Sequence, residues 1–344
     1  MRDTKRVEWM SKGKFGLMVH YLIDPVGETP DEKTKFLNET VNNFDIDRFM
    51  SYIDACGADW FQFTIAQNTG YYIGPNEYID SHIKGHTSER DLVHEFAKEM
   101  KKRGKHFLCY LPGETYSNCR NNPELYSVFK WDDSDPKKEA FCKCWEQVYR
   151  AYSQKFGTDC DGWWIDGCYD HHTNGLWDWS VFAEALRSGN PNSALAFSDG
   201  SFCIDSLYNI SDENDFFPGE VTACQEGKIR MDPEVFGFAV DDKYKDYRVT
   251  PEGFCPTKYG VKKYTPDSKY IDGALAHALV PFDYLWAIND LETPWIKYPA
   301  EELIYLVKSF NDVGGAVTLN APITMEGEIP EESLNKLIEV GKRI

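Results

Sequence analysis

One stretch of the sequence, GWWIDGCYDHH at residues 162–172, places an acidic side chain where it could do chemistry. The run Trp163-Trp164-Ile165 is typical of a buried strand, and it ends at Asp166, which a glycine follows. A carboxylate at this point has two explanations: Asp166 caps the next helix, or the strand presents an acid to a site. Alternate residues of a strand share a face, so Trp164 and Asp166 point the same way. The pattern favours an aromatic wall beside a reactive acid.

Other predicted strands also end on polar side chains, which can grip hydroxyl groups or move protons. These residues are His20, Gln67, Asn68, Glu114, Asp199 and Glu220. In a barrel of parallel strands the carboxyl ends of all strands meet at one rim. We therefore expect these side chains to gather around one site together with Asp166.

Strand-like and helix-like segments alternate along most of the chain. Strands are predicted at 15–21, 60–66, 106–112, 162–166, 194–200, 215–220, 282–290 and 315–321. Helices are predicted at 46–57, 88–104 with Ser88 as its cap, within 136–155, and at 177–187, 299–312 and 329–343. The simplest closed arrangement of about eight such pairs is a (β/α)8 barrel of the TIM type. A doubly wound open sheet is disfavoured, because no Gly-rich phosphate turn follows the first strand.

The domain organisation follows from this alternation. We expect an α/β fold with a single barrel domain over residues 1–344, interrupted by a long polar loop excursion near 221–275. No internal repeat, low-complexity tract or linker divides the chain.

Composition and charge exclude several classes of function. A net charge of −19 argues against nucleic acid and anionic membranes as partners and suits a neutral substrate. The N-terminus lacks a signal-like apolar run, and no stretch approaches the ~20 apolar residues of a membrane span, so we expect a cytoplasmic protein. The 10 cysteines are scattered without the paired CxxC spacing of a zinc site. This favours free thiols and predicts no metal and no cofactor.

Four segments of the chain resemble glycoside hydrolase family 29, the α-L-fucosidases. They are KFGLMVHYL, RDLVHEFAKEMKKRGKHFLCYLP, DGWWIDG and GGAVTLNAPITMEGEIPEE. The third is similar to the family's Trp-Phe-Asp-Gly strand, whose aspartate is the nucleophile. The family's usual C-terminal β-sandwich has no counterpart in the sequence, so the resemblance covers a catalytic barrel alone.

The resemblance implies a retaining exo-glycosidase that acts on a small glycan or glycoside with a terminal α-L-fucosyl or related sugar. In that double displacement one carboxylate attacks the anomeric carbon, and a second carboxyl group about 5–5.5 Å away transfers the proton. Asp166 takes the place of the nucleophile. Glu220, in the segment NDFFPGEV, takes the place of the acid/base, and Glu114 and Glu292 are the alternatives.

The sugar-binding positions match the family only in part. His20 resembles a family histidine that bonds a sugar hydroxyl, but Gln67 and Asn68 stand where two sugar-binding histidines are usual. Ser198-Asp199-Gly200 likewise lacks a family arginine. Amides both donate and accept hydrogen bonds, so hydroxyl recognition is retained with a different geometry, and the identity of the sugar stays open. The tyrosines of GYYIGPNEYID, Tyr71 among them, can replace lost contacts by stacking.

Two other functions stay open on the sequence. The barrel could bind carbohydrate without cleaving it, as happens when an acid/base is lost. It could also be an enzyme of other chemistry that uses His20 and the cluster 170–172 with a metal ion. His171 and His172 follow Asp166 closely, and we expect them to be solvated histidines of a loop.

Overall fold

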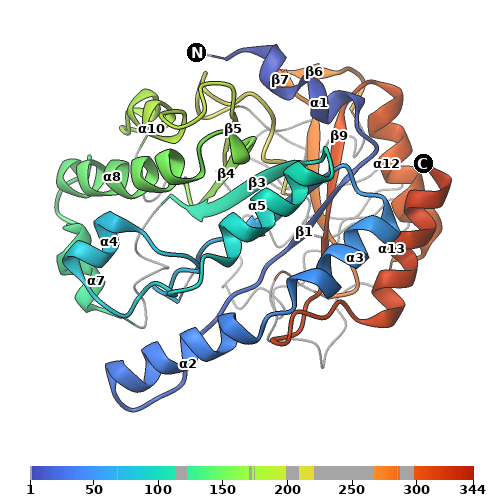
Figure 1. Cartoon of the computed structure of the whole chain (residues 1–344). Helices are drawn as coiled ribbons and strands as arrows, with labels where there is room; N and C mark the ends of the chain where they lie inside the picture. The colour runs from blue at the N-terminus through green and yellow to red at the C-terminus, as the bar shows by residue number, and fades with distance from the viewer. Residues whose placement is uncertain are drawn as a thin grey trace, which may run out of the picture.

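A computed structural model gives the fold of the chain (Figure 1). The residues that it describes are 2–67, 69–113, 122–169, 173, 175–198, 209–220, 266–284, 286 and 298–344. Within these ranges strands and helices alternate, as the sequence predicts for an α/β fold.

Seven strands form one curled parallel sheet. They are β1 (Gly16–Val19), β2 (Trp60–Thr64), β3 (His106–Pro112), β4 (Gly162–Asp166), β5 (Ala194–Phe197), β8 (His277–Pro281) and β9 (Ala316–Ala321). Their order is β5-β4-β3-β2-β1-β9-β8, so the first strand of the chain lies beside the last. This wrap-around order is consistent with a TIM-like barrel.

Helices connect the strands and cover the outer face of the sheet (Figure 1). They are α2 (Pro30–Asn43), α3 (Ile46–Cys56), α4 (Glu77–His82), α5 (Leu92–Lys102), α7 (Glu124–Phe129), α8 (Glu139–Phe156), α10 (Trp179–Leu186), α12 (Ala300–Asp312) and α13 (Glu331–Arg343). Between β2 and its helices the contact is aromatic. Phe61 and Phe63 pack against Phe96 of α5, with ring centroids 5.1 and 4.8 Å apart.

The start of α5 differs from the prediction. The helix begins at Leu92, and Asp91 is its cap, because the Asp91 side chain accepts a hydrogen bond from the backbone N–H of His94. The hydroxyl of Ser88, the predicted cap, instead accepts the N–H of Gly74 and donates to the carbonyl of Arg90. Ser88 therefore ties two loop segments together ahead of the helix.

Alternate strand residues fill the interior of the curled sheet. Met18, Trp60, Leu108, Trp164 and Leu279 belong to one buried apolar cluster that is separate from the helix-facing layer. Three polar side chains of this interior form a chain of contacts: Trp60 Nε1 donates to Thr318 Oγ1 at 2.9 Å, and Thr318 Oγ1 lies 2.9 Å from His277 Nε2.

A short N-terminal segment covers the amino ends of the strands (Figure 1). It consists of the 3₁₀ turn η1 (Thr4–Val7) and helix α1 (Glu8–Lys12). Val7 and Met10 are fully buried in the interior cluster, and Trp9 packs edge-on against Trp60 at the start of β2. This end of the sheet is therefore closed by apolar side chains.

The segment 215–220 runs between β8 and β5. It was predicted as a strand, but it forms only isolated parallel bridges, from Phe216 to Leu275 and from Glu220 to Leu279, and Gly219 has a left-handed backbone with φ 59°. On the other side the backbone N–H of Asp215 donates to the carbonyl of Leu195 in β5 at 2.8 Å.

Charged groups fix the start of this segment. The buried carboxylate of Asp215 accepts hydrogen bonds from Arg187 at 2.8 Å and Arg6 at 3.4 Å, and from the backbone N–H of Leu195 at 3.1 Å. One acid thereby joins the N-terminal segment, α10 and β5 to the segment that ends at Glu220.

The strand after the long loop begins earlier than predicted, and residues 285 and 287–290 of the predicted range lie outside the described residues. The strand is β8 at His277–Pro281, before the predicted range 282–290, and a small hairpin of β6 (Tyr270–Ile271) and β7 (Ala274–Leu275) lies inside the predicted loop 221–275. Asp283 has a left-handed backbone, with φ 67°, which ends the extended run. Its carboxylate is held by Ser333 and Lys336 of α13.

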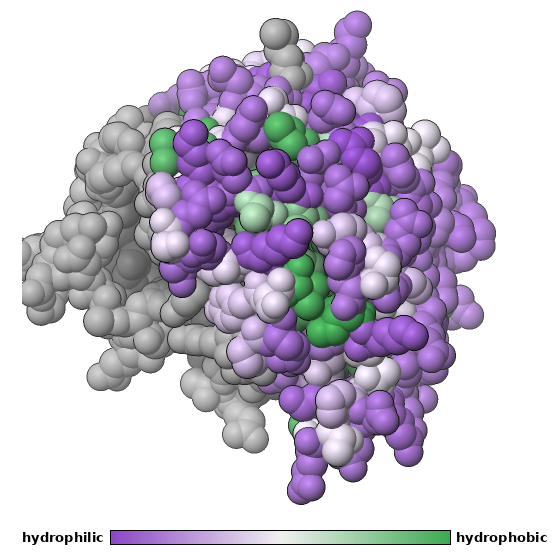
Figure 2. Space-filling view, turned by 90° about the vertical axis from the view of Figure 1, so that its left-hand side faces the viewer, coloured by the Kyte–Doolittle hydropathy of each residue, from purple (hydrophilic) through white to green (hydrophobic). Residues whose placement is uncertain are grey.

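The surface shown in Figure 2 is largely hydrophilic, with small hydrophobic patches between the charged side chains. This is the side of the molecule on which α4, α7 and α8 lie (Figure 1). Within the described part of the chain, none of the helices combines the length and the apolar character that crossing a bilayer requires.

Candidate active site

The carboxyl ends of the strands bring five polar side chains to one rim. They are His20 after β1, Asp166 at the end of β4, Ser198 after β5, Glu220 at the end of its segment and Asn320 near the end of β9. Asp166 is 6% exposed and Ser198 and Asn320 are fully buried, which is unusual for polar groups and requires hydrogen-bond partners.

Asp166 is the most heavily bonded of these groups. Its Oδ2 accepts a hydrogen bond from Gln67 Nε2 at 2.6 Å and one from the hydroxyl of Tyr110 at 2.5 Å. Its Oδ1 lies 3.3 Å from the hydroxyl of Tyr169. Every named contact donates to the carboxylate, so the arrangement stabilises its ionised form.

Two opposing effects set the acidity of Asp166. Burial raises its pKa above the usual value, because a charged carboxylate loses its hydration in the interior. The hydrogen bonds from the Tyr110 hydroxyl, the backbone N–H of Gly167, Gln67 and Tyr169 act in the opposite direction. Burial is the larger effect, so the pKa of Asp166 lies above that of an exposed aspartate.

Tyr110 connects the two sides of the site. Its ring stacks on Trp164, with centroids 5.0 Å apart, and meets the edge of His20 at 5.0 Å. Burial and the neighbouring Asp166 raise its pKa well above the usual range, and Glu220 adds to the effect. The phenol therefore keeps its proton and acts as a donor.

His20 is a neutral hydrogen-bonding group. Its Nδ1 lies 2.7 Å from Asn320 Oδ1, and Asn320 donates through Nδ2 to the carbonyl of Trp286. This places the ring proton on Nδ1 and leaves a lone pair on Nε2. Burial lowers the pKa of His20 to about 4, so the ring is uncharged at neutral pH. A neutral ring with a free acceptor suits a hydroxyl donor.

Glu220 occupies the same rim, on the far side of β5. It is half-buried, and its Oε2 lies 3.5 Å from the hydroxyl of Ser198. Ser198 is next to Phe197, which pairs with Ile165, the residue before Asp166. Two strand spacings, about 10 Å, thus separate the backbones that carry the two acids.

Two other residues that were predicted to contact the substrate, Trp164 and Tyr71, are buried and pack against protein side chains. Trp164 is 1% exposed, and its Nε1 donates to the carbonyl of Pro218, so it supports Tyr110 from within instead of presenting an open ring face. Tyr71 is buried and stacks on His86 with centroids 4.7 Å apart. Substrate contact stays a prediction for both residues.

Several sequence predictions fall outside the described residues. They concern Asn68, Glu114, His171, His172, Asp199 and Glu292. Of the candidate acids, the described ranges therefore include Asp166 and Glu220. Within those same ranges no cluster of three or more His, Cys, Asp or Glu side chains is arranged to hold a metal ion.

Sequence reasoning missed three groups at the site: Tyr110, Tyr169 and Asn320. Strand alternation contained the signal for two of them. Tyr110 pairs in register with Trp164, and Asn320 lies in the strand beside the one that leads to His20. A search for every polar side chain on the inward face, instead of the last residue of each strand, would have found both.

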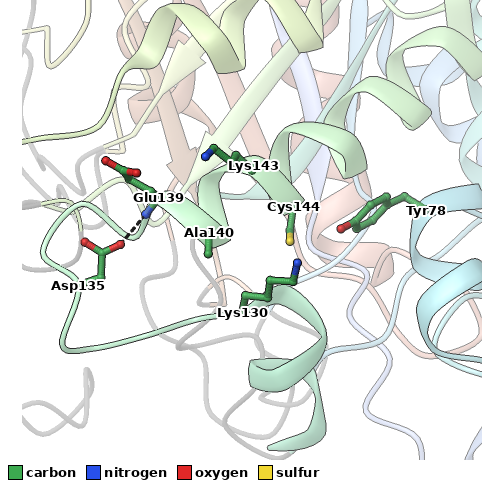
Figure 3. Close-up of a pocket in the computed structure, with 7 residues that line it drawn as sticks. All are labelled: Tyr78, Lys130, Asp135, Glu139, Ala140, Lys143 and Cys144. Carbon is green, nitrogen blue, oxygen red and sulfur yellow. Dashed lines mark hydrogen bonds between the residues drawn. The ribbon is translucent and has the colours of Figure 1, made fainter.

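A cavity of about 490 Å³ lies on the outer surface between α4, α7 and α8 (Figure 3). It is lined by Tyr78, Lys130, Asp135, Glu139, Ala140, Lys143 and Cys144. In Figure 3 the hydroxyl of Tyr78 points toward Cys144, and Asp135 bonds the backbone of Glu139. None of the rim residues lines this cavity, so it is distinct from the candidate active site.

Comparison with known proteins identifies a family. The family profile described as Alpha-L-fucosidase matches residues 30–250, more than half of the chain and a range that includes Asp166 and Glu220. No curated protein sequence matches the chain.

Solved structures of similar fold include α-L-fucosidases and endo-fucoidan hydrolases. α-L-Fucosidase isoenzyme 1 from Paenibacillus thiaminolyticus has 17% identity and a TM-score of 0.65, covering 99% of this chain and 76% of that one. α-L-Fucosidase AlfC from Lactobacillus casei, solved with its α-L-fucose product, has 13% identity and a TM-score of 0.59. The match covers 98% of this chain and 97% of that one. The family 107 endo-fucoidan hydrolase MfFcnA4 has 15% identity and a TM-score of 0.62, and this chain spans 53% of its length. At these identities the likeness shows the fold.

Proposed function

The chain belongs to the α-L-fucosidase family and is a glycoside hydrolase, and we propose that it cleaves a terminal α-L-fucosyl or related sugar from a glycan by a retaining double displacement. Asp166 is the nucleophile and Glu220 the acid/base of this proposal. The observation that supports it best is the carboxylate of Asp166, buried at the rim and held in place by hydrogen bonds from neighbouring donors.

The first step requires an oriented carboxylate. One oxygen of Asp166 attacks the anomeric carbon while the bond to the leaving oxygen breaks, which gives a covalent glycosyl-enzyme. Burial supports this role, because a carboxylate without a full hydration shell is a better nucleophile than one in water.

The second carboxyl group protonates the leaving oxygen and then removes a proton from water. Glu220 is half-buried at the same rim, so it is in contact with the site and can exchange protons with solvent. Side chains that lean inward from backbones about 10 Å apart can bring carboxyl groups to the roughly 5–5.5 Å of a retaining pair. Glu114 and Glu292 remain the alternatives for this role.

Sugar hydroxyls need neutral hydrogen-bonding groups. His20 supports such a contact, because Nδ1 is engaged by Asn320 and Nε2 is left as an acceptor. The names of the similar solved structures, α-L-fucosidases and endo-fucoidan hydrolases, support fucose as the sugar.

The proposal also includes a closed eight-stranded barrel, in which 215–220 takes the eighth position. Hydrogen bonds on both of its sides support this closure. The N–H of Phe217 donates to the carbonyl of Leu275 at 3.0 Å, and the N–H of Asp215 donates to the carbonyl of Leu195 at 2.8 Å. Closure would bring Glu220 around the rim toward Asp166.

The test is hydrolysis of a panel of aryl glycosides led by aryl α-L-fucoside, with a fucan oligosaccharide as a further substrate. We expect wild type to release fucose with retained configuration, and a slowly turned-over substrate to label Asp166 in a peptide map. Asp166→Ala should lower kcat/KM by roughly 10³-fold or more. Binding without hydrolysis would instead indicate a carbohydrate-binding barrel. Hydrolysis of another glycoside alone would reassign the sugar.

A further inference from the structure

The two oxygens of Asp166 have different surroundings. Oδ2 receives two short hydrogen bonds, from Gln67 Nε2 at 2.6 Å and from the Tyr110 hydroxyl at 2.5 Å. Oδ1 has the Tyr169 hydroxyl at the longer distance of 3.3 Å, and the backbone N–H of Gly167 is a further donor to the carboxylate. A carboxylate held in this way cannot rotate freely about its terminal bond, and its two oxygens are not equivalent.

We infer that Gln67 and Tyr110 are positioning residues that hold Oδ2 of Asp166, so that Oδ1 is the oxygen that attacks the anomeric carbon. The inference rests on the proposed function and assigns a role to each oxygen of its nucleophile. Gln67 was expected to contact the sugar, and its amide N–H is instead directed at the carboxylate.

The atoms of both chemical steps fit this assignment. A lone pair on Oδ1 forms the bond to the anomeric carbon, the leaving oxygen departs with the proton of Glu220, and Oδ2 becomes the carbonyl oxygen of the ester. In the second step water attacks, Glu220 takes its proton, and the bond from carbon to Oδ1 breaks. Negative charge then returns to the carboxylate, and the donors on Oδ2 stabilise it as a leaving group.

Both donors keep their protons over the working pH range. An amide does not titrate, and the pKa of Tyr110 is raised well above its usual value by burial and by Asp166. Tyr110 is also rigid, because its ring lies between Trp164 and His20. Among the described residues, the titratable groups that face this cluster are Tyr169, Glu220 and His20. The pKa of His20 is lowered to about 4, so its ring is neutral at higher pH.

The experiment compares Gln67→Glu, Gln67→Met and Tyr110→Phe with two matched controls. Gln154→Glu makes the same charge change at an exposed position of α8, and Tyr149→Phe removes a buried hydroxyl that donates to the carbonyl of Pro112 at 3.2 Å. The pKa of Asp166 is measured by difference infrared titration of its carboxyl band, identified by its loss in Asp166→Asn. This reading needs no substrate.

We expect each lost donor to raise the pKa of Asp166 by about one unit, and Gln67→Glu to raise it further because two carboxyl groups then share the site. In the pH profile of kcat/KM, the acid limb should move to higher pH by the same amount. The covalent intermediate should persist longer, with kcat reduced about tenfold or more and KM lowered with it, because slower hydrolysis of the intermediate lowers both constants. Both controls should match wild type.

A titration that does not move, with KM raised instead, would show that Gln67 contacts the sugar and would overturn the inference. If Tyr110→Phe fails to fold, the two Gln67 variants at the half-buried rim still decide the question. If wild type hydrolyses no glycoside, the proposed function fails by itself, and the infrared titration still reports whether Gln67 and Tyr110 hold Asp166.

Discussion

Asp166 and Glu220 are on the same rim but are held in different ways. Asp166 ends a strand that is paired in continuous register with β3 on one side and β5 on the other. Glu220 ends a segment that meets its neighbour at isolated bridges, and its side chain is half-buried. A nucleophile must be oriented to within a fraction of an ångström, whereas a proton carrier must exchange with water. The two constructions suit those two tasks.

The comparison predicts different responses to the leaving group. Glu220→Ala should lower kcat/KM by roughly 10²–10⁴-fold on a glycoside with a poor leaving group, because departure then lacks a proton donor. On an activated aryl glycoside the loss should be much smaller and azide should restore turnover, since the first step no longer needs an acid. Asp166→Ala should be inactive on both. An equal loss on both substrates for Glu220→Ala would transfer the acid/base role to Glu114 or Glu292.

The backbone of the Glu220 segment depends on buried charges. Asp215→Ala leaves Arg187 and Arg6 without their common carboxylate, so we expect the free energy of unfolding to fall by about 3–5 kcal/mol in urea denaturation. Glu301→Gln, which breaks an exposed bridge to Arg343, is the control and should leave Tm unchanged. Similar effects of the two substitutions would contradict the structural role of Asp215.

Two buried histidines make stability depend on pH. Burial lowers the pKa of His20 and of His277 to about 4, whereas in the unfolded chain each is close to 6.5. As pH falls from about 6.5 to 4, the unfolded state binds protons first, and stability is lost by up to about 3 kcal/mol per histidine.

Urea denaturation of wild type and His277→Gln at pH 7 and pH 4.5 tests this prediction. The variant should lose less stability between the two pH values than wild type does, because it lacks one of the two groups. An identical pH dependence in both proteins would show that His277 is not buried in its neutral form.

The smallest effect is expected next to the acid/base. The hydroxyl of Ser198 is 3.5 Å from Glu220 Oε2, at the limit of a hydrogen bond. Ser198→Ala should lower kcat/KM on a poor leaving group by about two- to tenfold, the equivalent of one ordinary hydrogen bond. A loss as large as that of Glu220→Ala would mean that Ser198 takes part in proton transfer itself.

Much of the fold was predictable, because its signals are local. The apolar runs at 106–112 and 162–166 coincide with β3 and β4, since strands buried on both faces are written as continuous hydrophobic stretches. β8 was misplaced because the apolar run continues past Pro281 to Phe282, and the end of the strand is set by Asp283 and its distant partner Lys336.

The site was predictable where a charged residue directly ends an apolar run, as Asp166 does. Tyr110 could not be recognised in this way, because a tyrosine within an apolar strand is common. Its role depends on contacts with Asp166, which is 56 positions away, and with His20, which follows another strand. Such pairings depend on register between strands, and no short stretch of sequence contains that information. The identity of the sugar depends on the same kind of contact.

The apolar closure formed by Val7, Met10 and Trp9 at the amino ends of the strands has a kinetic consequence. In the proposed reaction this closure leaves the carboxyl-end rim as the route that the aglycone, the attacking water and the released sugar must all use, one after another. The released sugar must leave before the next substrate enters. If the proposed reaction holds, we therefore expect the released sugar to be a competitive inhibitor.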